Sequence, residues 1–146
     1  MRHTVRNIMK NEVFILDSNI WISYVISRRL QDLVSHVQIH QFTVLTSKHL
    51  VTEISDVLAR PKFNKYIKQA DIKEVIAIHL KLCLLIETEE PTVSVSDPKD
   101  NFLISLCKYS NATVLVSGDK ELLKEATRHG YQVMTFKEFE SIKLNM

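Results

Sequence analysis

The stretch Val13-Phe14-Ile15-Leu16-Asp17 is a continuous apolar run that ends in an acidic residue. Four consecutive apolar residues are typical of a strand that is buried on both faces of a sheet. Residues 113–116, Thr-Val-Leu-Val, form a second strand-like run with three apolar residues, and Ser117, Gly118 and Asp119 follow it. The two runs therefore predict two buried strands, each closely followed by an acid.

Helical and extended patterns alternate along the rest of the chain. Pro98 after Asp97 is typical of a helix start, and Gly130 of a helix end. We expect strands over residues 13–16, 42–45, 83–87, 113–116 and 131–135. We expect helices over residues 19–27, 28–40, 47 to about 59, 71–82 and 136–142, together with one helix that begins at Pro98 and another that follows Asp119 and ends at about residue 128. This alternation predicts an α/β fold, a three-layer α/β/α sandwich with a central parallel sheet.

Composition and length limit the class of protein. The chain has 146 residues, of which 45% are hydrophobic and 25% charged, and this balance excludes a disordered tail, a collagen-like repeat and a disulfide scaffold. We expect one domain over residues 1–146, with its core between about 13 and 136. No apolar run approaches the roughly 20 residues that cross a bilayer. Cys83 and Cys107 form no metal-ligand pair, so we expect reduced thiols and a cytoplasmic location without membrane contact.

The distribution of charge says more than the net charge of +2, which is too small to indicate nucleic-acid binding. Residues 60–69 carry four basic side chains and no acid: Arg60, Lys62, Lys65 and Lys68. They are either contacts for nucleic-acid phosphates or a solvated basic surface. Tyr66 could stack on bases there, whereas Phe63 is expected in the core. The two glycines, Gly118 and Gly130, are too far apart to form a glycine-rich phosphate loop.

Two other features have simpler structural explanations. His36 and His40 have the spacing of a zinc-binding pair, but no third ligand lies nearby in the sequence. Trp21 is expected in the core or in a dimer interface rather than against a substrate.

Four acids are predicted to lie along one edge of the sheet: Asp17, Glu53, Asp100 and Asp119. Ligands of open parallel sheets bind where the strands end, and two of these acids follow predicted strands. Two like charges 4 Å apart repel by about 4 kcal/mol at an effective dielectric of 20. A hard divalent cation such as Mg²⁺ or Mn²⁺ removes this repulsion, and it can acidify a bound water and stabilise charge on a phosphodiester.

Each acid also has a purely structural explanation. Asp97 can cap the helix that Pro98 begins, with Asp100 favourable to the helix dipole. Asp119 can likewise cap its helix, and Glu53 can be an exposed helical acid. Asp17 is harder to explain in this way, because an acid that ends a fully apolar strand belongs to a site or has a charged partner.

Four segments resemble the motifs of PIN domains, a family of metal-dependent nucleases that includes VapC-type toxins. Residues 14–19, Phe-Ile-Leu-Asp-Ser-Asn, resemble the first motif, and residues 50–63 around Glu53 are similar to the second. Residues 97–103, Asp-Pro-Lys-Asp-Asn-Phe-Leu, resemble the third, and residues 114–123 resemble the fourth. The resemblance extends from about residue 13 to 136, with the four motifs in the right order.

The resemblance implies a set of metal-binding, catalytic carboxylates: Asp17, Glu53, Asp100 and Asp119. It implies that Asn19 and Ser117 hold these carboxylates in place, that Asp97 is a cap or an outer acid, and that Glu121 is a possible fifth acid. The implied reaction is hydrolysis of RNA with Mg²⁺ or Mn²⁺. For an RNA substrate, the four basic residues of segment 60–69 are the candidate phosphate contacts, with a solvated basic surface as the alternative.

The resemblance also implies partners, namely an antitoxin protein and a second copy of the chain in a homodimer. One alternative keeps the fold without the chemistry, as a non-catalytic RNA-binding or scaffolding PIN module. Another, a phosphotransferase with Asp17 as nucleophile, is disfavoured because Asn19 stands where that chemistry needs a second Asp.

Overall fold

The computed structural model describes residues 12–87, 98–110 and 114–143, and within the helix that begins at Pro98 it describes side chains from Phe102 onward. The predicted parallel sheet is confirmed. Its five strands lie in the order β3-β2-β1-β4-β5, and every neighbouring pair is parallel. The strands are β1 (Val13–Leu16), β2 (Thr43–Thr46), β3 (Leu84–Leu85), β4 (Val114–Val116) and β5 (Gln132–Met134).

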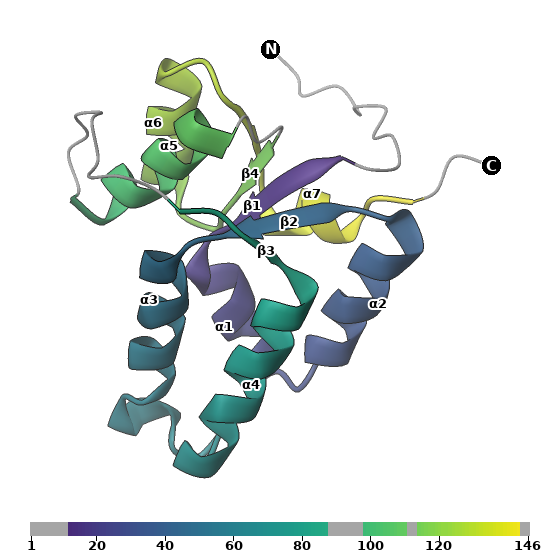
Figure 1. The fold of residues 1–146 in the computed structure, drawn as a ribbon, viewed down its shortest axis with the longest axis vertical. Helices are drawn as coiled ribbons and strands as arrows, with labels where there is room; N and C mark the ends of the chain where they lie inside the picture. The colour runs from purple at the N-terminus through teal and green to yellow at the C-terminus, as the bar shows by residue number, and fades with distance from the viewer. Residues whose placement is uncertain (1–11, 88–97, 111–113, 144–146) are drawn as a thin grey trace.

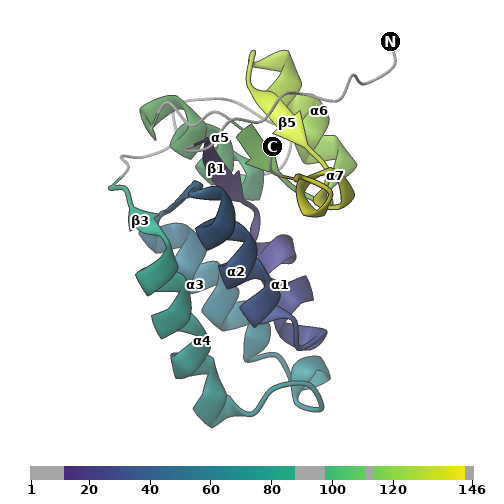
Figure 2. The ribbon, with the colours of Figure 1, turned by 90° about the vertical axis from the view of Figure 1, so that its right-hand side faces the viewer.

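Helices cover both faces of this sheet, as Figures 1 and 2 show. They are α1 (Ser18–Ile26), α2 (Leu30–His40), α3 (Lys48–Leu58), α4 (Gln69–Leu82), α5 (Pro98–Ser110), α6 (Lys120–Arg128) and α7 (Phe136–Glu140), with a 3₁₀ turn η1 (Pro61–Phe63) before α4. α5 and α6 lie on one face, and α1 to α4 lie on the other. The expected three-layer sandwich is therefore present. No described helix is both long and apolar enough to cross a membrane.

The two helical layers follow from the chain path. From β1 the chain proceeds to β2 and β3 on one side, and it then returns to β4 and β5 on the other side. Right-handed crossovers in opposite directions place their helices on opposite faces. The strand order thus reverses between β1 and β4, and open α/β sheets bind ligands at this point, beyond the carboxyl ends of the strands.

The apolar runs that predicted the strands form the centre of the core. Phe14, Ile15 and Leu16 have no exposed surface, and all three residues of β4 are buried. Trp21 is also buried, so it lies in the core rather than in an interface. Because both faces of β1 are covered by helices, its pattern is continuous rather than alternating.

Helix ends explain where the predicted boundaries differ from the structure. The strand predicted over 42–45 begins at Thr43, because Gln41 has a left-handed backbone (φ 57°) and the Phe42 N–H bonds to the Val37 carbonyl. The helix predicted from residue 28 begins at Leu30, because Arg28 is also left-handed (φ 61°). The strand predicted over 83–87 contains only two residues, since the Cys83 N–H still bonds to α4.

Among the predicted helix ends, those at Ser47 and Gly130 are present, and a further cap at Thr135 was missed. The Ser47 hydroxyl accepts a hydrogen bond from the Leu50 N–H at 3.2 Å and so caps α3. Gly130, with φ 87°, follows α6 in the left-handed conformation that favours glycine. Thr135 and Glu138 form a reciprocal capping box at the start of α7, which the sequence analysis did not single out.

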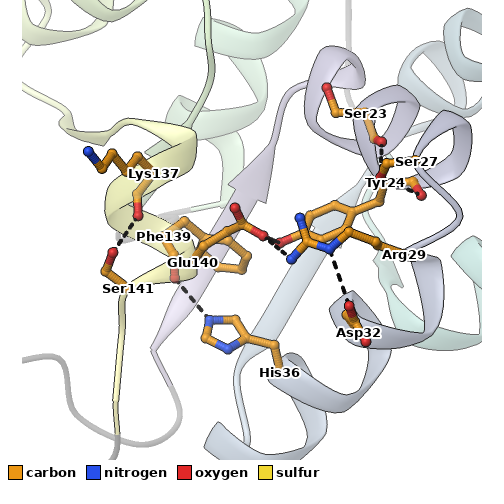
Figure 3. Close-up of polar contacts among 10 residues, drawn as sticks. All are labelled: Ser23, Tyr24, Ser27, Arg29, Asp32, His36, Lys137, Phe139, Glu140 and Ser141. Carbon is orange, nitrogen blue, oxygen red and sulfur yellow. Dashed lines mark hydrogen bonds and ion pairs between the residues drawn. The ribbon is translucent and has the colours of Figure 1, made fainter.

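A polar cluster ties α7 to α1 and α2 (Figure 3). The Glu140 carboxylate accepts hydrogen bonds from the Tyr24 hydroxyl at 3.0 Å and from the Arg29 guanidinium at 2.6 Å. His36 donates from Nε2 to the Phe139 carbonyl at 2.9 Å. These bonds hold the C-terminal helix against the layer that contains α1.

Candidate functional site

Asp17 lies at the point where the strand order reverses. It directly follows β1, and its N–H donates to the Val116 carbonyl of β4 at 2.9 Å. It occupies the N-cap position of α1, but its side chain makes no capping hydrogen bond. Only 7% of the residue is exposed. A carboxylate at this position is therefore nearly buried and is not needed to start the helix.

A hydroxyl group from the loop after β4 and an amide group from the first turn of α1 hold this carboxylate. The Ser117 hydroxyl, which has no exposed surface, donates to Asp17 Oδ2 at 2.8 Å, and Asn19 Nδ2 donates to the same oxygen at 3.1 Å. Gly118 N–H donates to Asn19 Oδ1 at 3.3 Å. Asn19 and Ser117 therefore both contact Asp17, whereas their role in supporting a metal site stays a prediction. Together they fix one oxygen of Asp17.

Glu53 lies close enough for its charge to act on Asp17. Burial raises the pKa of the Asp17 carboxyl above its usual range, the Ser117 hydrogen bond opposes this, and the negative charge of Glu53 raises it further. No basic side chain forms an ion pair with Asp17 within the described part of the chain. The structure thus keeps a buried acid beside a second acid without a cation of its own.

Asp119 caps α6 and is connected to the same loop. Its Oδ1 accepts from the N–H groups of Glu121 at 3.0 Å and Leu122 at 3.3 Å, so the capping explanation is confirmed. Its own N–H donates to the Ser117 hydroxyl at 2.9 Å, one bond away from Asp17. Within the described residues Oδ2 of Asp119 has no hydrogen-bond partner, so the cap leaves one oxygen for another ligand. Glu121 instead lies exposed, 4.0 Å from Lys124.

For Asp97 and Asp100, the two remaining predicted acids, no side chain is described. Asp100 lies in the first turn of α5, and Asp97 lies outside the described residues. Among the side chains that are described, no three His, Cys, Asp or Glu residues form a ready metal site. The described part of the predicted set is thus the Asp17–Glu53 pair, with Asp119 joined to it through Ser117.

The chemistry of these side chains fits a hard divalent cation. Carboxylate oxygens are the preferred protein ligands of Mg²⁺ and Mn²⁺. A cation would relieve both the burial of the Asp17 charge and its repulsion by Glu53, the two effects that raise the pKa of this carboxyl.

Sequence reasoning missed His49. This residue lies one turn before Glu53 on α3, and its ring stacks on Phe102 of α5 with the centroids 3.5 Å apart and the planes 10° apart. The stack joins the helix of Glu53 to the helix of Asp100. Its spacing of four residues from Glu53 places both side chains on one helix face, which is the signal that could have identified it.

The remaining predicted residues lie elsewhere. His36 and His40 bond to backbone carbonyls, at 2.9 Å each, and form no metal group with a third described ligand. The four basic residues of segment 60–69 lie between α3 and α4, at the end of α3 away from Ser47.

Comparisons with known proteins agree on the fold. The structure of VapBC2 from Rickettsia felis, bound to a DNA fragment from its promoter, contains a chain with a TM-score of 0.58 and 15% identity, with 84% of this chain and 98% of that one covered. PAE2754 from Pyrobaculum aerophilum has a TM-score of 0.63 and 14% identity, over 94% and 96% of the two chains. No curated protein matches by sequence.

A family model assigns the chain more directly than these distant structures. The model of the PIN domain matches residues 13–121, which include β1, the Ser117 loop and Asp119. PIN domains are generally nucleases. The match spans well over half of the chain and contains the buried Asp17 site, and the chain therefore belongs to the PIN-domain family.

Proposed function

We propose that this protein is a metal-dependent endoribonuclease and the toxin half of a toxin–antitoxin pair. The observation that carries the proposal is Asp17, a buried carboxylate with a second acid beside it and with no ion pair to a described basic residue. A fold gains no stability from this arrangement, because burial and like charge both disfavour the ionised acid. A bound Mg²⁺ or Mn²⁺ supplies the missing positive charge.

The chain's own residues would perform three tasks in the reaction. Asp17, Glu53, Asp100 and Asp119 would hold the cation, which when bound provides an acidified water and stabilises charge on the phosphodiester. Ser117 and Asn19 orient Asp17 through its Oδ2, so the carboxylate has a fixed direction before substrate arrives. Asp119 is held in turn by its cap to α6. Preorganised acids of this kind lower the reorganisation needed at the moment of hydrolysis.

The first test compares purified wild type with Asp17→Asn, in Mn²⁺, Mg²⁺ or EDTA, on single-stranded and transfer RNA. We expect cleavage by the wild type that EDTA abolishes, and no cleavage by Asp17→Asn. The matched control is Asp56→Asn, which removes an exposed acid from the same helix as Glu53 and should cleave normally. Metal-dependent cleavage that survives Asp17→Asn would contradict the site assignment.

The same variant separates catalysis from folding. Because burial raises the pKa of the Asp17 carboxyl, the metal-free protein stabilises the neutral form of this group, and its stability falls as pH rises from the ordinary value of 3.8 through the raised one. Asp17→Asn is neutral at every pH. In EDTA its unfolding midpoint at pH 7 should therefore equal or exceed that of the wild type, and Mn²⁺ should raise the midpoint of the wild type only.

The proposed partners follow from the family and from the VapBC2 likeness. We propose a separate antitoxin chain and a homodimer. Light scattering of the purified chain tests the dimer, and co-purification of a second chain that suppresses RNA cleavage tests the antitoxin. A folded protein that binds RNA but cleaves none of the substrates in Mn²⁺ would favour the non-catalytic module instead.

A further inference from the structure

The segment between α3 and α4, here called the basic loop, comprises residues 60–68. Its four basic side chains are all exposed, and none forms an ion pair within the described part of the chain: Arg60, Lys62, Lys65 and Lys68. Three basic residues elsewhere, Arg29, Lys124 and Arg128, each have an acidic partner. The basic loop therefore presents a local charge of +4 to solvent, twice the net charge of the whole protein.

This loop has a defined backbone. Pro61–Phe63 forms the 3₁₀ turn η1, and the N–H groups of Tyr66 and Ile67 bond to the Phe63 carbonyl at 2.9 and 3.0 Å. Ile67 is buried and Phe63 packs against the core, so the segment is anchored at two points. Side chains carried by such a backbone are positioned before a partner binds, which lowers the entropy cost of binding.

Aromatic rings lie among the charges. Lys62 Nζ lies 5.1 Å from the centroid of the Phe63 ring, and Lys65 Nζ lies 5.2 Å from that of Tyr66. Tyr66 is 42% exposed although it is a large aromatic residue. A basic surface with an exposed ring suits a single strand of nucleic acid, whose phosphates need cations and whose unpaired bases stack on aromatic side chains.

We propose that the basic loop binds the sugar–phosphate backbone of a single-stranded RNA, with Tyr66 stacking on one of its bases. The inference rests on the proposed nuclease function and adds the surface that holds the substrate. The carboxylate site repels phosphates, so a nuclease of this kind must gain its affinity for RNA elsewhere. Among the residues that the structure describes, unpaired positive charge is most concentrated in the basic loop.

The basic loop also lies close enough to Glu53 for both to contact one RNA strand. α3 connects the two regions, as Figures 1 and 2 show, with Ser47 at its sheet end and the basic loop beyond its far end. Arg60 follows Glu53 by seven residues, which corresponds to roughly 10 Å at the helical rise of 1.5 Å per residue. An RNA strand that lies at Glu53 can therefore extend along α3 to the loop.

The experiment measures binding of a fluorescein-labelled, mixed-sequence single-stranded RNA in EDTA, across a salt series. The loop variant replaces Arg60, Lys62, Lys65 and Lys68 with Gln. For single strands, each phosphate contact contributes about 0.7 to the slope of log K against log salt, so four contacts should reduce its magnitude by about 3. The matched control changes one exposed arginine and three exposed lysines elsewhere to Gln, none of which forms an ion pair within the described residues: Arg28, Lys81, Lys137 and Lys143. It should keep the wild-type slope.

Two further measurements make the outcome decisive. Tyr66→Ala should weaken binding of the single strand about fivefold or more and leave binding of a duplex RNA unchanged. If the loop variant misfolds by circular dichroism, the milder Lys62→Gln/Lys68→Gln pair should still reduce the slope by about 1.4.

Equal effects of the loop and control variants would overturn the proposal, because binding would then follow net charge alone. Unchanged RNA binding by the loop variant would also overturn the proposal. An acidic protein segment would then be the favoured ligand of the basic loop. Cleavage by the wild type in Mn²⁺ is scored separately, so a failed loop is distinguishable from a failed nuclease.

Discussion

His79 provides the sharpest test of how the interior of this protein responds to acid. The side chain has no exposed surface, and its ring packs edge-on against Trp21 at a centroid distance of 4.2 Å. Nε2 shares a hydrogen bond of 2.7 Å with Thr46 Oγ1, whereas Nδ1 has no partner among the described residues. A protonated ring would therefore bury a positive charge and an N–H without an acceptor, which is costly.

The size of the effect follows from the pKa. Burial lowers the pKa of His79 from 6.5 to about 4. Between these values the unfolded chain binds a proton that the folded chain does not, so the free energy of unfolding falls as pH falls. At 1.36 kcal/mol per pKa unit, the loss is about 2 kcal/mol at pH 5 and about 3 kcal/mol at pH 4. Stability is fully retained above pH 6.5.

The assay is urea unfolding in EDTA at pH 7, 6, 5 and 4 for wild type and His79→Gln. Glutamine keeps an amide for Thr46 and does not titrate. The difference in unfolding free energy between the two proteins should move by about 2 kcal/mol in favour of the variant between pH 7 and pH 5. Asp17 and His36, whose pKa values are also shifted, contribute equally to both proteins and cancel. His129→Gln, which changes an exposed histidine, should keep the wild-type pH dependence. Parallel curves for wild type and His79→Gln would refute the reasoning.

Three further outcomes are expected elsewhere in the molecule. Ser117→Ala removes the hydrogen bond to the Asp17 carboxylate and leaves the Asp119 N–H without its acceptor. The free energy of unfolding at pH 7 should therefore fall by about 2–3 kcal/mol in the urea assay. Ser117→Thr keeps the hydroxyl, and its free energy of unfolding should fall by less than half of this amount. His49→Ala should weaken Mn²⁺ binding measured by calorimetry because α3 and α5 lose their ring stack, and His49→Phe should restore it; equal loss in both variants would contradict a stacking role. Burial raises the pKa of the Cys107 thiol to about 12, so it should react with iodoacetamide at pH 7.5 only after unfolding in urea, and rapid labelling of the native protein would show that the helix opens.

The sequence predicted the fold well because its strongest signals are local. A fully apolar β1 and β4 indicate strands covered on both faces, and Ser47 and Gly130 mark helix ends through their own side chain or backbone. The boundaries were less accurate at residues 28, 42 and 83. At residues 28 and 42, a left-handed residue, Arg28 or Gln41, sets where the next element begins. At residue 83, the last hydrogen bond of the preceding helix extends to Cys83 and delays the strand.

The site was predictable in part for a related reason. Asp17 ends an apolar strand, and Asp119 follows another, so topology alone places them at one edge of the sheet. The roles of Asn19 and Ser117 came from the resemblance to PIN domains, and the structure adds the contacts: both side chains hold the same oxygen of Asp17. Contacts between residues almost 100 positions apart depend on how β1 and β4 pair.

What the sequence alone determined is the order of the elements, their type and the residues able to ligate a cation, because these follow from local periodicity and side-chain chemistry. Only the tertiary structure decided that Asp17 is buried beside Glu53, that His49 stacks on Phe102, and that His79 lies sealed against Trp21. Each of these depends on distance and on exclusion of water, which arise when separate elements pack together and which no single segment of the sequence contains.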